Sequence, residues 1–230
     1  MKTKIYQIPD LKNRRFIFDD RDHAGLILAE LLRPYYENRP QTIVLGIPSG
    51  GVPIAIQISR NLVLPMDLLI IRKIPVPGNP EAGMGAITLS GEMFLNEDLI
   101  YHLGITPEQI EGQIQRVKKE LVERNGLFRK NRPEPDLEGK TVIIADDGLA
   151  SGFTTLAAVE TCKKAGATRM VVAAPTGSDT AISRLSGKVD EIFCPNIRSG
   201  QYFAVAEAYR NWYDLDRNEV VKRLEKAGIL

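Results

Sequence analysis

The chain has 230 residues, with 30 Lys and Arg residues against 29 Asp and Glu residues, and a formal net charge of +1. This near-balance argues against a protein dedicated to nucleic acids or membrane surfaces, because both classes usually carry a large basic excess. Hydrophobic residues at 43% and charged residues at 26% are ordinary for a globular chain and exclude wholesale disorder.

Strand-like and helix-like segments alternate along most of the chain, which is typical of a parallel sheet with crossover helices. An amphipathic helix is predicted to begin near Asp19 or Asp20. Apolar runs that suit strands covered on both faces follow at residues 42–47, 67–71, 140–145, 169–174 and 189–193. We therefore predict an α/β fold with a parallel central sheet flanked by helices.

The segment between the second and third predicted strands departs from this alternation. Residues 86–95 have the pattern of a hairpin with Ser90-Gly91 at its turn. A long helix is predicted from Thr106, and the Pro-rich connector 131–136 leads back to the sheet. We interpret residues 1–230 as a single domain, in which a hood covers the core. The core is expected at about 41–90 and 139–194, and the predicted hood at about 1–40, 91–138 and 195–230.

The strongest functional signal follows the third predicted strand. Two adjacent acids, Asp146 and Asp147, come at the carboxyl end of this strand, where ligands bind in open α/β sheets. A Gly-, Ser- and Thr-rich loop follows, and a helix is predicted directly after it, from Leu156. Such a loop and helix N-terminus can surround one anion with N–H donors, while carboxylates accept hydrogen bonds from sugar hydroxyls. A phosphorylated sugar satisfies both halves of the site.

This segment, VIIADDGLASGFTT at residues 142–155, resembles the phosphoribosyl pyrophosphate (PRPP) signature of type I phosphoribosyltransferases, with a mild departure at Gly148. A strand followed by an ordinary capped helix would explain the loop but not both acids. The resemblance implies that Asp146 and Asp147 are catalytic residues that hold the ribose 2- and 3-hydroxyls. It implies that the 5-phosphate is bound by Gly148, Leu149, Ala150, Ser151, Gly152, Phe153, Thr154 and Thr155.

A second Gly-rich loop follows the first predicted strand. Residues 46–52 (GIPSGGV) resemble the family's pyrophosphate loop, which usually contains a cis peptide bond, although a Gly pair here is also common in an ordinary turn. The resemblance implies that Pro48, Ser49, Gly50 and Gly51 bind pyrophosphate. Relatives often carry Arg or Lys where this chain has Ser49, so a positive charge is missing at this position.

Arg72 and Lys73 come at the end of the second predicted strand, before a Pro- and Gly-rich excursion at residues 74–85. This excursion is placed where the family has a loop that closes over the reaction. The resemblance implies that Arg72 and Lys73 contact the pyrophosphate and act as catalytic residues beside the two acids. Ordinary strand-end charges in solvent are the alternative. Glu81 within the excursion could face the acceptor or cap the loop.

The order of these motifs resembles a subgroup of predicted phosphoribosyltransferases over most of the chain. The resemblance implies an enzyme that transfers the 5-phosphoribosyl group of PRPP to an unidentified nitrogen acceptor, such as a nucleobase, with release of pyrophosphate. It implies Mg²⁺ as the cofactor, held mainly by substrate and water near Asp146 and Asp147 rather than by direct protein ligands. We expect no DNA or membrane partner, and a homodimer because the family commonly pairs.

Two other functions are weighed against this one. A regulator that binds PRPP as a sensor without turnover is the main alternative, and the uncharged Ser49 suits it slightly. A receiver-like phosphoacceptor fits poorly, because the phosphate loop directly follows the acids.

Aromatic residues crowd the C-terminal segment, where they could stack on the acceptor or pack in the core: Tyr202, Phe203, Tyr209, Trp212 and Tyr213. Cys162 and Cys194 are too few and too far apart for a disulfide framework or a zinc site. No apolar run approaches the roughly 18 residues of a membrane span, and charged residues interrupt the N-terminus before a signal-peptide core could form. We therefore expect a cytoplasmic location.

Overall fold

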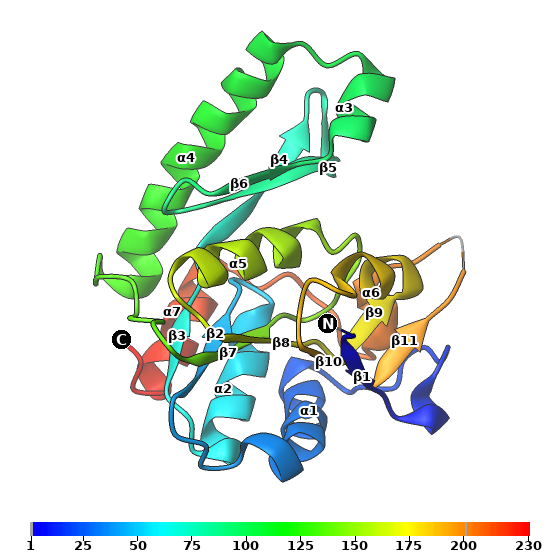
Figure 1. Cartoon of the computed structure of the whole chain (residues 1–230), viewed down its shortest axis with the longest axis vertical. Helices are drawn as coiled ribbons and strands as arrows, with labels where there is room; N and C mark the ends of the chain where they lie inside the picture. The colour runs from blue at the N-terminus through cyan, green and yellow to red at the C-terminus, as the bar shows by residue number, and fades with distance from the viewer. Residues whose placement is uncertain (1, 201) are drawn as a thin grey trace.

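A six-stranded, all-parallel sheet lies at the centre of the computed structural model (Figure 1), which describes residues 2–200 and 202–230, without the side chains of residues 80 and 81. Its strands are, in spatial order, β1 (Lys4–Tyr6), β10 (Glu191–Phe193), β8 (Arg169–Ala173), β7 (Thr141–Ala145), β2 (Thr42–Gly46) and β3 (Met66–Leu68). The predicted α/β class with a parallel central sheet is confirmed.

The register of the three central strands positions the site. Gly46 of β2 lies opposite Ala145 of β7, which lies opposite Ala173 of β8, so the three strands end at the same level. The loops that follow parallel strands meet at one sheet edge. The Gly-rich loop after β2 and the acid pair after β7 are therefore neighbours in space.

Helices cover both faces of this sheet (Figure 1). Helix α5 (Phe153–Lys164) and the short α6 (Asp179–Leu185) pack on one face, against side chains such as Ile144 and Val172. Helices α1 (Arg21–Tyr36) and α2 (Gly51–Leu62) pack on the other face, against the alternate residues Ile143 and Val171. Continuous apolar strands follow from this arrangement, because each face buries every second residue.

A second layer, the upper lobe (residues 71–129), stands above α5 in Figure 1. It contains an antiparallel sheet of β4 (Ile71–Val76), β5 (Asn79–Thr88) and β6 (Met93–Leu95), followed by α3 (Glu97–Leu103) and α4 (Pro107–Arg129). The predicted hairpin is confirmed as β5–β6. The predicted strand at 67–71 is divided, because the chain leaves the central sheet after β3 and Ile71 already pairs with Thr88 in the upper lobe.

The two chain ends differ from the predicted hood. Residues 4–36 belong to the core, since β1 pairs with β10 and the apolar face of α1 is buried against the sheet. In the C-terminal part, β11 (Asn196–Arg198) pairs with β9 (Thr176–Ser178) beside the core. Helix α7 (Arg217–Lys226) packs against α4 of the upper lobe through Val220 and Leu224. Two short 3-10 turns, η1 (Pro9–Leu11) and η2 (Val205–Ala208), also lie in these terminal parts.

Within the described residues, no helix is long and apolar enough to span a membrane.

Candidate active site

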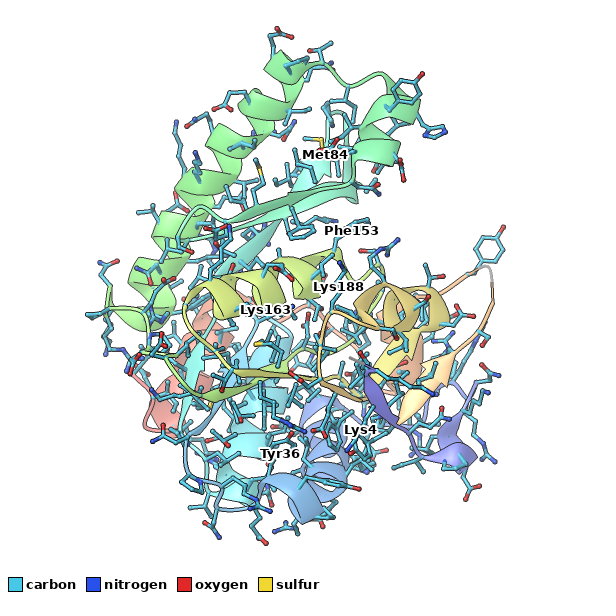
Figure 2. All side chains as sticks on the ribbon, viewed as in Figure 1. Lys4, Tyr36, Met84, Phe153, Lys163 and Lys188 are labelled. Atoms are coloured by element: carbon cyan, nitrogen blue, oxygen red, sulfur yellow. The ribbon has the colours of Figure 1, made fainter. Side chains whose placement is uncertain are left out.

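A cavity of about 440 Å³ opens between the core and the upper lobe. The core contributes Asp146 and the loop after it, and the upper lobe contributes β5 and the start of α3. Figure 2 labels Phe153 on the core side and Met84 on the upper-lobe side. The lining residues are Lys73, Gly83, Gly85, Asn96, Leu99, Asp146, Gly148, Leu149, Ala150, Ser151, Gly152, Phe153, Thr154 and Thr155. The structure thus brings the complete predicted 5-phosphate loop, one predicted acid and Lys73 to one cavity.

The loop after β7 presents unused backbone donors to this cavity. Among the hydrogen bonds of residues 2–200 and 202–230, none is donated by the amides of Ala150, Ser151, Gly152, Thr154 and Thr155. Gly152 has φ +79°, a left-handed conformation that favours glycine, and α5 begins directly after it. Several N–H groups and a helix N-terminus in one turn form a preorganised anion site.

Contacts from α6 and its N-cap hold this loop in place. The hydroxyl of Ser178 donates to the carbonyl of Ala150 at 2.7 Å. Arg184 donates to the carbonyl of Ser151, and its guanidinium lies 4.2 Å from the centre of the Phe153 ring. These bonds occupy the carbonyl oxygens of the loop and leave its N–H groups to a ligand.

The two acids have different environments. Asp146 lines the cavity, and its Oδ1 accepts a 2.8 Å hydrogen bond from the amide of Asp147. Asp147 is turned away, and its Oδ2 accepts a 2.8 Å hydrogen bond from Nε of Arg21. Burial raises the pKa of both carboxyl groups; the neighbouring Asp147 raises that of Asp146 further, whereas Arg21 opposes the rise at Asp147. The predicted pair is therefore asymmetric: Asp146 faces the ligand space and Asp147 is held in an ion pair.

Arg21 was missed by the sequence analysis. It is the first residue of α1, and its Nη1 also donates to the carbonyl of Tyr213 at 2.9 Å. Its guanidinium lies 3.9 Å from the ring centre of Trp212, and the hydroxyl of buried Tyr209 donates to the carbonyl of Asp147 at 2.6 Å. Trp212 therefore packs on the arginine that binds Asp147, and Tyr209 holds the backbone of Asp147, on the side away from the cavity. No local signal marks Arg21, because it lies 126 residues from Asp147 in the sequence.

The predicted pyrophosphate loop lies on the far side of Asp147 and does not line the cavity. Its Pro48–Ser49 peptide bond is cis. Within the described chain, the amides of Ser49 and Gly50 donate to no acceptor. A Cβ at Gly50 would lie 1.9 Å from Oδ2 of Asp147, and one at Gly51 would lie 2.4 Å from the carbonyl oxygen of Ala145. Both glycines are required by this close approach of the two loops.

The two predicted basic residues point to different places. Lys73 lines the cavity, whereas Arg72 forms an ion pair with Glu120 of α4 at 2.7 Å. Both residues lie in β4 of the upper lobe rather than at the end of a core strand, so adjacent side chains project to opposite faces. The side chain of Glu81 lies outside the described residues.

The buried position of Asp146 gives a first testable prediction. Because the pKa of Asp146 is raised in the folded chain, ionisation of this carboxyl group lowers the free energy of unfolding. This loss is absent below the ordinary Asp pKa and grows as the pH rises. Asp146→Asn is therefore expected to raise the midpoint of chemical unfolding at pH 7, and the gain should shrink toward pH 4. Asp214 is exposed, so Asp214→Asn provides the matched control and should not change the unfolding midpoint at pH 7 or at pH 4. A loss of stability at pH 7 would contradict the assigned environment.

Comparison with known proteins agrees with this geometry. The family described as phosphoribosyl transferase domain matches residues 19–210, which is most of the chain and includes both loops and the acid pair. The chain belongs to this phosphoribosyltransferase family. A Mycobacterium tuberculosis (strain H37Rv) protein named for the phosphoribosyl transferases is 36% identical over 211 residues, which cover 92% of this chain and 47% of the relative. The chain thus spans about half the length of the curated relatives it matches first.

Solved structures share the fold of this phosphoribosyltransferase chain. The crystal structure of the TT1426 protein from Thermus thermophilus is 31% identical, with a TM-score of 0.72, and the match covers 93% of this chain and 99% of that one. The AQ2163 protein from Aquifex aeolicus is 15% identical with a TM-score of 0.52, over 82% of this chain and 78% of that one, and shows likeness of fold alone.

Proposed function

We propose that this chain transfers the 5-phosphoribosyl group of PRPP to a nitrogen nucleophile and releases pyrophosphate, with Mg²⁺ as the cofactor. The observation that carries the proposal is the cavity in which the unused amides of residues 150–155 lie beside the Asp146 carboxylate and Lys73. A phosphate, a ribose diol and a second anionic group are the ligand features that match these three elements.

The 5-phosphate would accept hydrogen bonds from the loop amides at the start of α5, which fixes one end of the sugar. Asp146 would accept hydrogen bonds from the ribose hydroxyls, and Arg21 keeps the adjacent Asp147 carboxylate neutralised. The amides of Ser49 and Gly50, together with Lys73, would bind the pyrophosphate. Displacement at the anomeric carbon has an oxocarbenium-like transition state, so positioning and stabilisation of the leaving group account for the rate.

The donor set is compatible with Mg²⁺. The carboxylate oxygen atoms of Asp146 are hard donors at the edge of the cavity, and Mg²⁺ binds one or two carboxylates together with substrate phosphates and water. When bound, the ion would neutralise charge on the pyrophosphate oxygens. The substrate and water would hold it beside Asp146, and Asp147 would stay in its ion pair with Arg21.

The acceptor would enter from the upper-lobe side of the cavity. Asn96 and Leu99, at the beginning of α3, line the cavity opposite the phosphate loop. They offer an amide and an apolar surface, which suit a planar nitrogen base. The C-terminal aromatics Tyr209 and Trp212 pack around Arg21 instead. A homodimer and a cytoplasmic location stay predictions.

Calorimetry with PRPP in the presence and absence of Mg²⁺ tests the proposal. The wild-type chain should bind PRPP in a Mg²⁺-dependent manner, and Asp146→Asn should weaken binding about 10–100-fold, the range expected for lost hydrogen bonds to a charged group. Thr154→Ala should weaken it too, whereas Asp214→Asn should not. No binding by folded protein would overturn the PRPP assignment. Pyrophosphate release with a panel of nitrogen bases then tests turnover, and binding without turnover would identify a PRPP sensor.

A further inference from the structure

The predicted pyrophosphate loop contains no cation of its own. Residues 46–52 include neither Lys nor Arg, yet a leaving pyrophosphate carries several negative charges that must be stabilised. Arg124, on α4 of the upper lobe, reaches this loop from outside. Its Nη1 donates to the carbonyl oxygen of Pro48 at 3.5 Å, immediately before the free amides of Ser49 and Gly50. Figure 1 shows that α4 runs down beside the upper-lobe sheet and that its lower end comes close to α7 and the core.

Arg124 lies among more cations than anions: Arg72 and Arg217 are close to it, and Glu120 is the acid whose charge acts on it. Among the described residues, no carboxylate forms an ion pair with Arg124, and its buried Nε has no hydrogen-bond partner. The nearby acid Glu120 is engaged by Arg72 at 2.7 Å. Burial and the neighbouring guanidinium groups of Arg72 and Arg217 lower the pKa of Arg124 to about 10, so it stays protonated at neutral pH.

A partly buried cation beside two others is unfavourable unless an anion joins them. An arginine has five N–H donors in a planar fork that matches phosphate oxygens, and the structure assigns a protein acceptor to only one nitrogen of Arg124. Its position at Pro48 puts the remaining donors beside the loop whose amides are also unused. Guanidinium and backbone N–H donors gathered at one loop are the composition of an anion site.

We propose that Arg124 binds the pyrophosphate group of PRPP and supplies, from α4, the positive charge that the pyrophosphate loop lacks. This inference rests on the proposed function and assigns a binding residue that lies 76 residues away from the loop. It also gives α4 a role in the reaction, because Arg124 would bind the pyrophosphate together with Lys73 and the amides of Ser49 and Gly50.

The test compares ligands that contain pyrophosphate with one that lacks it. Arg124→Met should weaken the binding of PRPP and of inorganic pyrophosphate about 10–100-fold, as expected for a lost charge-assisted contact. The binding of ribose 5-phosphate, which lacks pyrophosphate, should not change. Arg124→Lys keeps the charge without the fork and should lose less. The matched control is Arg116→Met, which removes an exposed arginine from the same helix and should leave all three affinities unchanged.

The outcomes separate this inference from the proposed function. If wild-type protein binds PRPP and Arg124→Met binds it equally well, the inference is wrong and the proposed function stands. If Arg124→Met loses ribose 5-phosphate to the same extent as PRPP, Arg124 only ties α4 to the loop, and the inference is wrong again. If folded wild-type protein binds no PRPP, both fail. Thermal unfolding of each variant reports folding, and Arg124→Lys carries the test if the methionine variant does not fold.

Discussion

Arg21→Met is expected to destabilise the folded chain by about 3–5 kcal/mol, the cost of breaking a buried ion pair by removing one partner. The side chains of Arg21 and Asp147 are only 8% and 16% exposed, and their contact is 2.8 Å long. Without Arg21, the Asp147 carboxylate would be buried next to Asp146 with no cation. PRPP binding should weaken as well, because a second uncompensated negative charge would lie beside the proposed phosphate sites. Chemical denaturation and calorimetry measure the two effects.

The pH dependence and a double variant identify the cause of this loss. Arg21 opposes the burial that raises the pKa of Asp147, so its removal raises this pKa further. The deficit of Arg21→Met should therefore be largest at neutral pH and shrink as the pH falls, because protonation removes the unpaired charge. Arg21→Met combined with Asp147→Asn should recover most of the lost stability. Simple addition of the two single effects would show that the ion pair is not the reason.

Arg129→Met is expected to cost a similar amount, about 3–5 kcal/mol, through a different buried ion pair. Arg129 is 1% exposed and binds Asp67 of β3 in a bidentate manner at 3.0 and 2.8 Å. Its remaining donors bond to Asn125 and to the carbonyls of Arg132 and Pro133, so one guanidinium joins the end of α4, the core sheet and the connector. Removal would leave several buried acceptors unpaired. The free energy of unfolding from urea titration gives the measurement.

Arg132 provides the matched control for this prediction. It lies on the same carboxylate, at 3.8 Å from Asp67, but its side chain is 45% exposed. A solvent-exposed pair contributes about 0–1 kcal/mol, so Arg132→Met should change stability little. Equal losses of stability in the two variants would show that burial of the Arg129–Asp67 ion pair is not the reason for the effect of Arg129→Met. Ribose 5-phosphate binding should survive in both, since neither residue lines the cavity.

The central sheet was predictable because its signal is local. The apolar runs at residues 42–47, 140–145 and 169–174 are long enough to be recognised as buried strands. The observed strands β2, β7 and β8 nearly coincide with them. The short β1 was missed because Lys4–Tyr6 carries no apolar pattern of its own and becomes a strand only by pairing with β10. The division of the predicted strand at 67–71 likewise depends on a tertiary partner, since Ile71 pairs with Thr88.

The site divides in the same way. The sequence alone determined the family, the acid pair and the Gly-rich loop 148–155 after it, because these residues are contiguous and one strand–loop–helix unit sets their geometry. Only the tertiary structure decided that Asp146 rather than Asp147 faces the cavity, and that Lys73 rather than Arg72 does so. It also brought Arg21 and Arg124 to the two loops. Their partners, the Asp147 carboxylate and the Pro48 carbonyl, are far away in the sequence, and each guanidinium reaches its partner only because helices pack against the sheet edge.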